Sequence, residues 1–89
     1  MKAIVTVIGK DRKGIIAKVS NFLYENEINI EDITQTIMQD SFSMVMMVNT
    51  DAISVDFTEI VKKATALGEE MGLEIKIQSE EIFNSMHKI

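Results

Sequence analysis

The fold of this 89-residue chain is organised around the stretch VIGKDRKGIIAKV, residues 7–19. Its first residues complete an apolar run, Gly9 ends that run, four charged residues follow, and Gly14 opens a helical pattern. This order predicts a strand, a tight polar loop and a helix that begins at the rim of the loop. The N-terminus of a helix carries free N–H groups and a positive partial charge, so a small anionic group could be held at this junction.

Composition limits the classes of protein that the chain can represent. Its length and its 46% content of hydrophobic residues predict one globular domain with a small core, which oligomerisation would help to stabilise. The net charge of −5 argues against binding of nucleic acid, and the absence of cysteine excludes disulfides and thiolate metal sites. A single histidine, His87, cannot form a histidine metal site alone, so we expect no metal and no cofactor. No signal peptide is visible and the longest apolar run, Met44–Val48, is too short to span a membrane, so we expect a cytoplasmic protein.

The first half of the chain predicts a strand, a helix and a second strand. Residues 2–8 are apolar on both alternating faces, as in a central strand. After Gly14 the apolar residues recur at helical spacing, and Asn26 is expected to end the helix in a left-handed conformation. Residues 31–39 mix β-branched and polar side chains, which predicts a strand near the edge of a sheet.

The second half repeats this order of elements. Residues 42–49 alternate after a polar turn, which predicts a hairpin strand whose even-numbered face is apolar and lies against the helices. Ser54 is the expected N-cap of a second helix and Gly72 its end. Residues 73–78 then predict a last strand with one buried face. A short amphipathic stripe follows at Ile82, Phe83, Met86 and Ile89.

Two strand-helix-strand units and a short helix predict an α+β fold, the ferredoxin-like βαββαβ sandwich. Its four-stranded antiparallel sheet would carry both long helices on one face. The domain is expected to span residues 1–80, with residues 81–89 as a C-terminal helical extension. The opposite face of the sheet would expose Val45 and Met47, and either the C-terminal stripe or a second subunit could cover it.

The loop between the two glycines carries the candidate chemistry. Gly9 and Gly14 satisfy the GxxxxG spacing of a phosphate loop, but Ile15 and Ile16 stand where Lys and Ser/Thr would bind phosphate and magnesium, which excludes nucleotide hydrolysis. Asp11 lies three residues before Gly14, a spacing at which its carboxylate can cap the helix amides. Alternatively, Asp11 faces the ammonium group of a zwitterionic ligand while the amides around Gly14 and Ile15 meet the carboxylate of that ligand. Gly14 could also serve only to let the chain approach a neighbouring strand.

A small basic cluster, Lys10, Arg12 and Lys13, lies in this loop of an otherwise acidic chain. These side chains form either a solvated loop surface or a device that steers a carboxylate toward the junction. The methionines in the stretch 44–47 are interpreted as core residues. No pair of carboxylates and no Ser-His-Asp arrangement is spaced for catalysis, so we expect a protein without enzymatic activity.

Two segments resemble the ACT domain family, Val7-x-Gly9-x-Asp11-Arg12-x-Gly14-Ile15-Ile16-Ala17-x-Val19 and Ile28-Asn29-Ile30. The Asp-Arg-x-Gly variant is similar to that of glycine-cleavage-system repressors and formyltetrahydrofolate deformylases, and the chain length is similar to that of small standalone ACT-domain proteins. The resemblance covers nearly the whole chain, although many members carry proline where this chain has Lys13. It implies a regulatory module that binds an amino acid where this loop meets a neighbouring domain. By position it implies ligand contacts from Asp11, Gly14 and Ile15 on the loop and from Asn29 at the start of the second strand.

The leading hypothesis is a non-enzymatic regulatory ACT domain that binds a small amino acid at the subunit interface of a homo-oligomer, through Asp11, Arg12, Gly14, Ile15 and Asn29. A separate regulated protein would sense the ligand-bound state. The alternative is an assembly module that dimerises without a ligand. A third hypothesis, an acylphosphatase-like enzyme, would need Arg12 to converge with Asn29 or Asn49 on a phosphate. The dimer surface stays open between an edge strand, the open sheet face and the C-terminal stripe.

Overall fold

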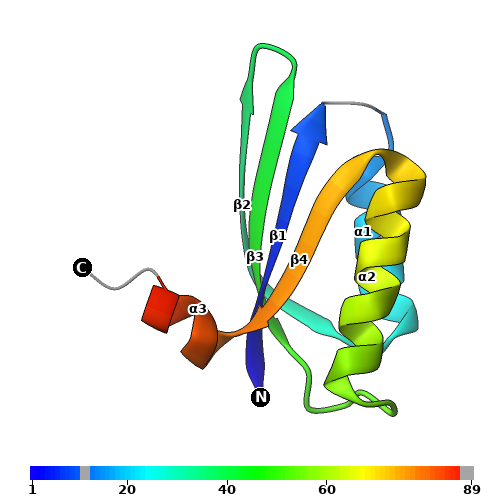
Figure 1. Ribbon diagram of the computed structural model, residues 1–89, viewed down its shortest axis with the longest axis vertical. Coiled ribbons are helices and arrows are strands. Elements are labelled where there is room, and N and C mark those ends of the chain that lie inside the picture. Colours follow the sequence, from blue (N-terminus) through cyan, green and yellow to red (C-terminus); the bar gives the residue numbers. More distant parts are fainter. Residues whose placement is uncertain (11–12, 87–89) are drawn as a thin grey trace.

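The described part of the chain, residues 1–10 and 13–86 of the computed structural model, forms four strands and three helices. In chain order they are β1 (Lys2–Lys10), α1 (Ile15–Glu25), β2 (Asn29–Met38), β3 (Ser41–Asn49), α2 (Phe57–Met71), β4 (Leu73–Ser79) and α3 (Glu80–Met86). The strands pair antiparallel in the order β2-β3-β1-β4. This is the predicted ferredoxin-like α+β fold, with α1 and α2 on one face of the sheet and α3 on the other (Figure 1).

Alternation along the strands builds the core between the sheet and the two long helices. Because successive side chains of a strand point to opposite faces, every second residue of each inner strand enters this core. The prediction that the even-numbered face of β3 packs against the helices is confirmed. The buried side chains include Ala3, Val5 and Val7 of β1, Phe42, Met44, Met46 and Val48 of β3, Ile15, Val19 and Leu23 of α1, and Ile60 and Ala64 of α2.

α3 lies over the sheet face that α1 and α2 leave open (Figure 1). It contacts β1 and β4, and Phe83 and Val45 together line hollows beside it. The side-chain amide Nε2 of Gln78 donates to the sulfur of Met86 at 3.3 Å. Ile4, which shares this face of β1, is consequently only 5% exposed. The C-terminal stripe therefore supplies part of the predicted cover, while Ile89 lies outside the described residues.

The end of α1 differs from the prediction by one residue. Asn26 has φ of −97°, and Glu27 adopts the left-handed conformation with φ of +59°. The N–H of Ile28 donates to the carbonyl oxygen of Leu23 at 2.9 Å and that of Glu27 to Tyr24 at 3.0 Å, which together form a Schellman motif. Leu23 and Ile28 are both buried, as in the apolar contact that accompanies this motif. That contact explains why Glu27, and not Asn26, adopts the left-handed conformation.

The predicted N-cap of α2, Ser54, is wrong by two residues. Asp56 occupies that position with extended backbone, and its carbonyl oxygen accepts from the N–H groups of Glu59 at 2.9 Å and Ile60 at 3.3 Å. The physical reason is that Phe57 packs against the core and begins the apolar face of the helix, so the cap must directly precede it. Gly72 ends α2 with φ of +72°, as predicted.

Candidate functional site

The loop that follows β1 turns into α1 at Gly14. This residue has φ of +84°, in the left-handed region that favours glycine, and a Cβ there would meet no atom of the described residues within 4 Å. Gly14 is therefore required by its backbone conformation, and the alternative that it permits close approach to a strand is wrong. At Gly9, a Cβ would overlap Cδ2 at the end of the Leu73 side chain, its partner on β4, but that side chain can rotate away and the nearest backbone atom would lie 3.4 Å off.

The start of α1 presents backbone donors on its first turn. The carbonyl oxygen of Gly14 accepts the first helical hydrogen bond, from the N–H of Lys18 at 2.9 Å. The preceding N–H groups, those of Ile15, Ile16 and Ala17, have no acceptor within the helix. Together with the dipole of the helix they form a site of positive potential for a carboxylate.

A hollow of about 450 Å³ lies beside these donors, between the start of α1 and the β2–β3 hairpin. Its size is in the range of small-molecule sites, and most of its lining side chains are apolar. We call it the α1–β2 hollow. It is lined by Gly14, Ile15, Ile16 and Ala17 from the start of α1 and by Gln35, Ile37 and Phe42 from the hairpin.

The predicted ligand-binding residues are only partly brought together. Gly14 and Ile15 line the α1–β2 hollow, as the loop hypothesis requires. Asp11 and Arg12 lie outside the described residues. Asn29 is exposed at the beginning of β2, and six residues of strand, about 20 Å, separate it from Gln35 in the same protomer.

The convergence required by the acylphosphatase-like hypothesis is absent from the topology of the described residues. Asn49 pairs with Asn29 and with Lys2 at one end of the sheet. The loop that contains Arg12 leaves β1 after Lys10, at the other end, about 27 Å away along the strand. Neither asparagine can therefore meet that loop on a common phosphate within one protomer.

Three residues that line the hollow, Gln35, Ile37 and Phe42, had no functional role in the sequence interpretation. Phe42 was assigned to the core, and it is buried at the floor of the hollow. For Ile37 the sequence did contain an indication of a role, since it is a large apolar residue on a strand predicted to be half-solvated. Its side chain is 52% exposed, which no packing requirement of the single chain explains.

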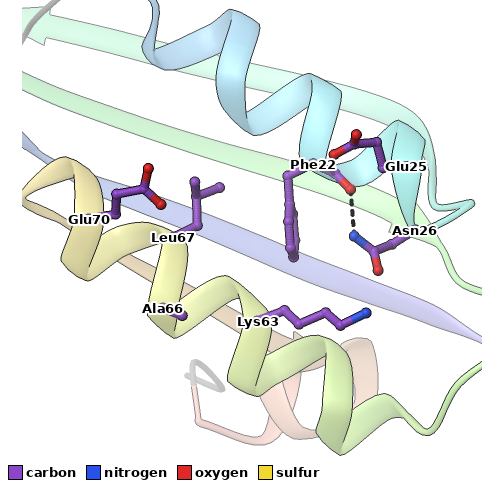
Figure 2. A pocket seen from close by; sticks show the side chains of 7 residues that line it. All are labelled: Phe22, Glu25, Asn26, Lys63, Ala66, Leu67 and Glu70. Carbon is purple, nitrogen blue, oxygen red and sulfur yellow. Dashed lines mark hydrogen bonds between the residues drawn. The ribbon is translucent and has the colours of Figure 1, made fainter.

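A second hollow, of about 430 Å³, lies on the outer side of the two long helices (Figure 2). Phe22 and Leu67 point into it from α1 and α2, and both also pack against the core. The side-chain amide of Asn26, which also lines this groove, donates to the carbonyl oxygen of Phe22 at 2.8 Å. This groove lies along the flanks of two helices, so it lacks the free backbone donors of a helix N-terminus.

Charged groups elsewhere lie apart from the α1–β2 hollow. The N-terminal ammonium group of Met1 donates to Asp51 and holds the pKa of that carboxyl below its usual value. Within residues 1–10 and 13–86, no group of three or more His, Cys, Asp or Glu side chains is arranged to hold a metal ion. None of the helices in that part of the chain has the length and apolar character needed to cross a membrane.

Comparison with known proteins gives concordant matches over nearly the whole chain. A model of the ACT domain family matches residues 2–78. A UPF0237 protein of Listeria innocua is 52% identical over 89 residues, which is 100% of both chains. The solved structure of an ACT domain protein from Streptococcus pneumoniae has a TM-score of 0.82 and 43% identity over 93% of each chain. The regulatory subunit of aspartate kinase from Thermus thermophilus has a TM-score of 0.67 and 26% identity, over 86% of this chain and 50% of that one.

Proposed function

This chain belongs to the ACT domain family, and from that membership we propose that it is a regulatory module without catalytic activity that binds a small amino acid in the α1–β2 hollow. The observation that carries the proposal is the first turn of α1, whose N–H groups have no acceptor within the helix and adjoin an apolar hollow of about 450 Å³. A related fold forms the regulatory subunit of an aspartate kinase, which supports a regulatory role for this domain.

The two ends of an amino acid fit different parts of the site. The ligand carboxylate would accept from the N–H groups of the first turn of α1. Asp11 would face the ammonium group and Arg12 would steer the carboxylate toward the junction. The ligand side chain would enter the hollow, where Ile16, Ile37 and Phe42 favour an aliphatic group.

Asn29 fits this scheme only as a contact from a neighbouring subunit. It lies about 20 Å along β2 from Gln35 of its own protomer, too far to touch a ligand held at the start of α1. The proposal therefore includes a homo-oligomer in which the loop of one subunit and the beginning of β2 of another approach the same ligand. A separate regulated protein would respond to the ligand-bound arrangement.

Thermal unfolding against a panel of amino acids tests the proposal. A ligand that binds only the folded state stabilises it by about 2.7 kcal/mol at a hundredfold excess over its Kd. We expect valine, leucine or isoleucine to raise the Tm and glutamate and lysine to leave it unchanged. Ala17→Phe fills the α1–β2 hollow and should abolish the response. The matched control Ala66→Phe places the same side chain in the groove of Figure 2 and should preserve it.

The alternative, an assembly module without a ligand, is favoured by the exposed isoleucines of β2. No Tm shift with any amino acid, in a protein shown by light scattering to be a dimer, would establish that alternative. A shift that persists in both Ala17→Phe and Asp11→Ala would place the site elsewhere on the protein.

A further inference from the structure

The strand β4 forms one edge of the sheet, and the outer side of this edge is hollowed. Within the described part of the chain β4 pairs only with β1, so no strand lies on its other side. A hollow of about 330 Å³ lies along that side, and it is lined by Thr65 and Glu69 of α2 and by Leu73, Glu74, Ile75 and Lys76 of β4. Because consecutive strand residues point to opposite faces of the sheet, a hollow lined by four of them in a row lies at the edge itself. The edge of β4 is therefore accessible to a further strand.

The sequence of β4 is complementary to itself in polarity and in charge. Residues 73–77 read Leu-Glu-Ile-Lys-Ile, so a two-fold axis at Ile75 sets apolar residues opposite apolar residues and Glu74 opposite Lys76 of a second copy. The side chains of Glu74 and Lys76 are 59% and 62% exposed, on the face of the sheet opposite to the buried Ile75. Charged residues at an edge usually prevent pairing with another strand. At this edge, antiparallel pairing about Ile75 would instead place each charge opposite a charge of the other sign.

Glu74 and Lys76 already form an ion pair within the chain, with Nζ of the lysine 3.1 Å from Oε1 of the glutamate. A single exposed pair of this kind contributes little to stability, whereas several charges in a network contribute more. In a dimer about Ile75 the two strands would bring together two glutamates and two lysines on one face of the sheet. Each charged group in this cluster would have neighbours of the opposite sign along its own strand and across the interface.

The flank of α2 above this edge has a second self-complementary pair of charges. Thr65 and Glu69 line the hollow at the β4 edge, and Lys62 shares their side of the helix because it lies three and seven residues before them. This flank faces away from α1, since Lys63 and Glu70 line the groove between the two helices (Figure 2). Lys62 and Glu69 are exposed, and neither makes an ion pair with another residue of the described ranges. Both charges are therefore available to a partner at the β4 edge.

The midpoint between Lys62 and Glu69 lies at the level of Ile75, so one axis can relate both pairs of charges. A Cβ at Gly68 would lie 2.7 Å from the carbonyl oxygen of Leu73 and 3.3 Å from the nitrogen of Ile75, which places Gly68 over the strand between these two residues. α2 and β4 run in opposite directions (Figure 1). From the level of Gly68, the midpoint lies about 4 Å back along the helix and Ile75 lies about 3 Å forward along the strand, which is the same direction.

We propose that two copies of this chain pair their β4 edges antiparallel about a two-fold axis at Ile75. Glu74 then lies opposite the partner's Lys76, and Lys62 lies beside the partner's Glu69. A second copy is the occupant that these charges select, because each group meets its opposite when the same pattern is presented in reverse. The pairing is independent of the proposed ligand site, since β2 and the α1–β2 hollow lie toward the other edge of the sheet.

Charge reversal tests this pairing, with the association constant measured by sedimentation. Glu74→Lys gives β4 two positive charges, and Lys76→Glu gives it two negative charges. Each variant alone should associate at least about tenfold more weakly than the natural protein at low ionic strength, because like charges then lie opposite each other. An equimolar mixture of the two variants should regain the association, because strands of opposite charge complement each other. Lys62→Glu and Glu69→Lys should behave in the same way, weakened alone and restored when mixed.

Matched controls and the outcomes that contradict the proposal complete the design. Glu70→Lys and Lys63→Glu make the same changes of net charge on the α1 side of α2, and they should associate as the natural protein does. All the substituted side chains are exposed, so every variant should keep the circular dichroism spectrum of the natural protein. A β4 mixture that associates no better than its components would show that Glu74 and Lys76 pair only within one chain. Unchanged association of the single β4 variants, or a natural protein that stays monomeric at all concentrations, would also overturn the dimer. Restoration in the β4 mixture with no effect of the α2 variants would overturn the axis at Ile75.

Discussion

Gly68 of α2 lies directly against the backbone of Leu73 at the start of β4. A Cβ at Gly68 would come within 2.7 Å of the carbonyl oxygen of Leu73, closer than packed atoms tolerate. Alanine is normally the better helix residue by about 1 kcal/mol, so glycine at this buried helical position is explained by the contact. The close approach fixes how α2 lies on the last strand.

The first prediction follows from this contact. Gly68→Ala should lower the free energy of unfolding by about 1–3 kcal/mol, because the backbone of Leu73 cannot move away without distorting β4. Gly9→Ala is the matched comparison, since its Cβ would meet the end of the Leu73 side chain, which can rotate. Urea denaturation should show the larger loss for Gly68→Ala, and equal losses would mean that α2 shifts freely on the sheet.

Gly14 gives a second prediction, which separates backbone conformation from packing. Its φ of +84° is unfavourable for β-branched residues but is tolerated by asparagine, and no atom of residues 1–10 and 13–86 would touch a Cβ. Gly14→Val should therefore cost about 1–2 kcal/mol of stability, while Gly14→Asn should cost a few tenths. Chemical denaturation of the two variants measures this difference. If asparagine is as harmful as valine, the side chain must clash with part of the loop.

Local sequence patterns predicted the strands and helices of this fold well, because period-two and helical patterns depend only on neighbouring residues. The apolar face of β3, the edge position of β2 and the left-handed Gly72 were all predicted correctly. The end of α1 and the start of α2 were misplaced, because tertiary packing determines both positions. Phe57 and Ile28 are fixed by packing against the core, and that packing selected Asp56 and Glu27 over the residues that local propensity favours.

The candidate site was less predictable, since its walls come from segments far apart in the chain. The helix start at Gly14 was visible as a local pattern, but its proximity to Gln35 and Ile37 follows from the sheet order. Ile33 and Ile37 were placed on a half-solvated edge strand, but that both are exposed on the helix side of the sheet follows only from the register of β2 against β3.

α3 supplies the third prediction, which concerns the open sheet face. Phe83 and Val45 line hollows beside α3, and Ile4 on the same face is buried. Phe83→Ala should lower the free energy of unfolding by about 1–2 kcal/mol and increase the binding of a hydrophobic dye. The exposed neighbour Ser85 provides the control, because Ser85→Ala should change stability by less than about 0.5 kcal/mol. Equal behaviour of the two variants would show that α3 does not cover the sheet in solution.

The fourth prediction concerns pH. The ammonium group of Met1 lowers the pKa of Asp51, so the folded state binds a proton at this carboxyl less readily than the unfolded state does. The resulting stabilisation is present above the ordinary pKa of aspartate and is lost as the pH falls through the lowered value. Urea titrations should show Asp51→Asn less stable than the natural protein at pH 7 and equal to it near pH 2. A difference that persists at low pH would mean that the substitution acts through something other than the charge of the Asp51 carboxylate.

The fifth prediction links ligand and dimer. If a neighbouring subunit completes the ligand site, as the proposed function requires, the ligand binds the dimer more tightly than the monomer, and by thermodynamic reciprocity it must strengthen dimerisation by the same factor. Sedimentation at protein concentrations near the dimer Kd should show an about tenfold or greater increase in association when the ligand is added. An association constant that the ligand leaves unchanged would mean that each hollow is complete within one protomer, and the dimer would then serve assembly alone.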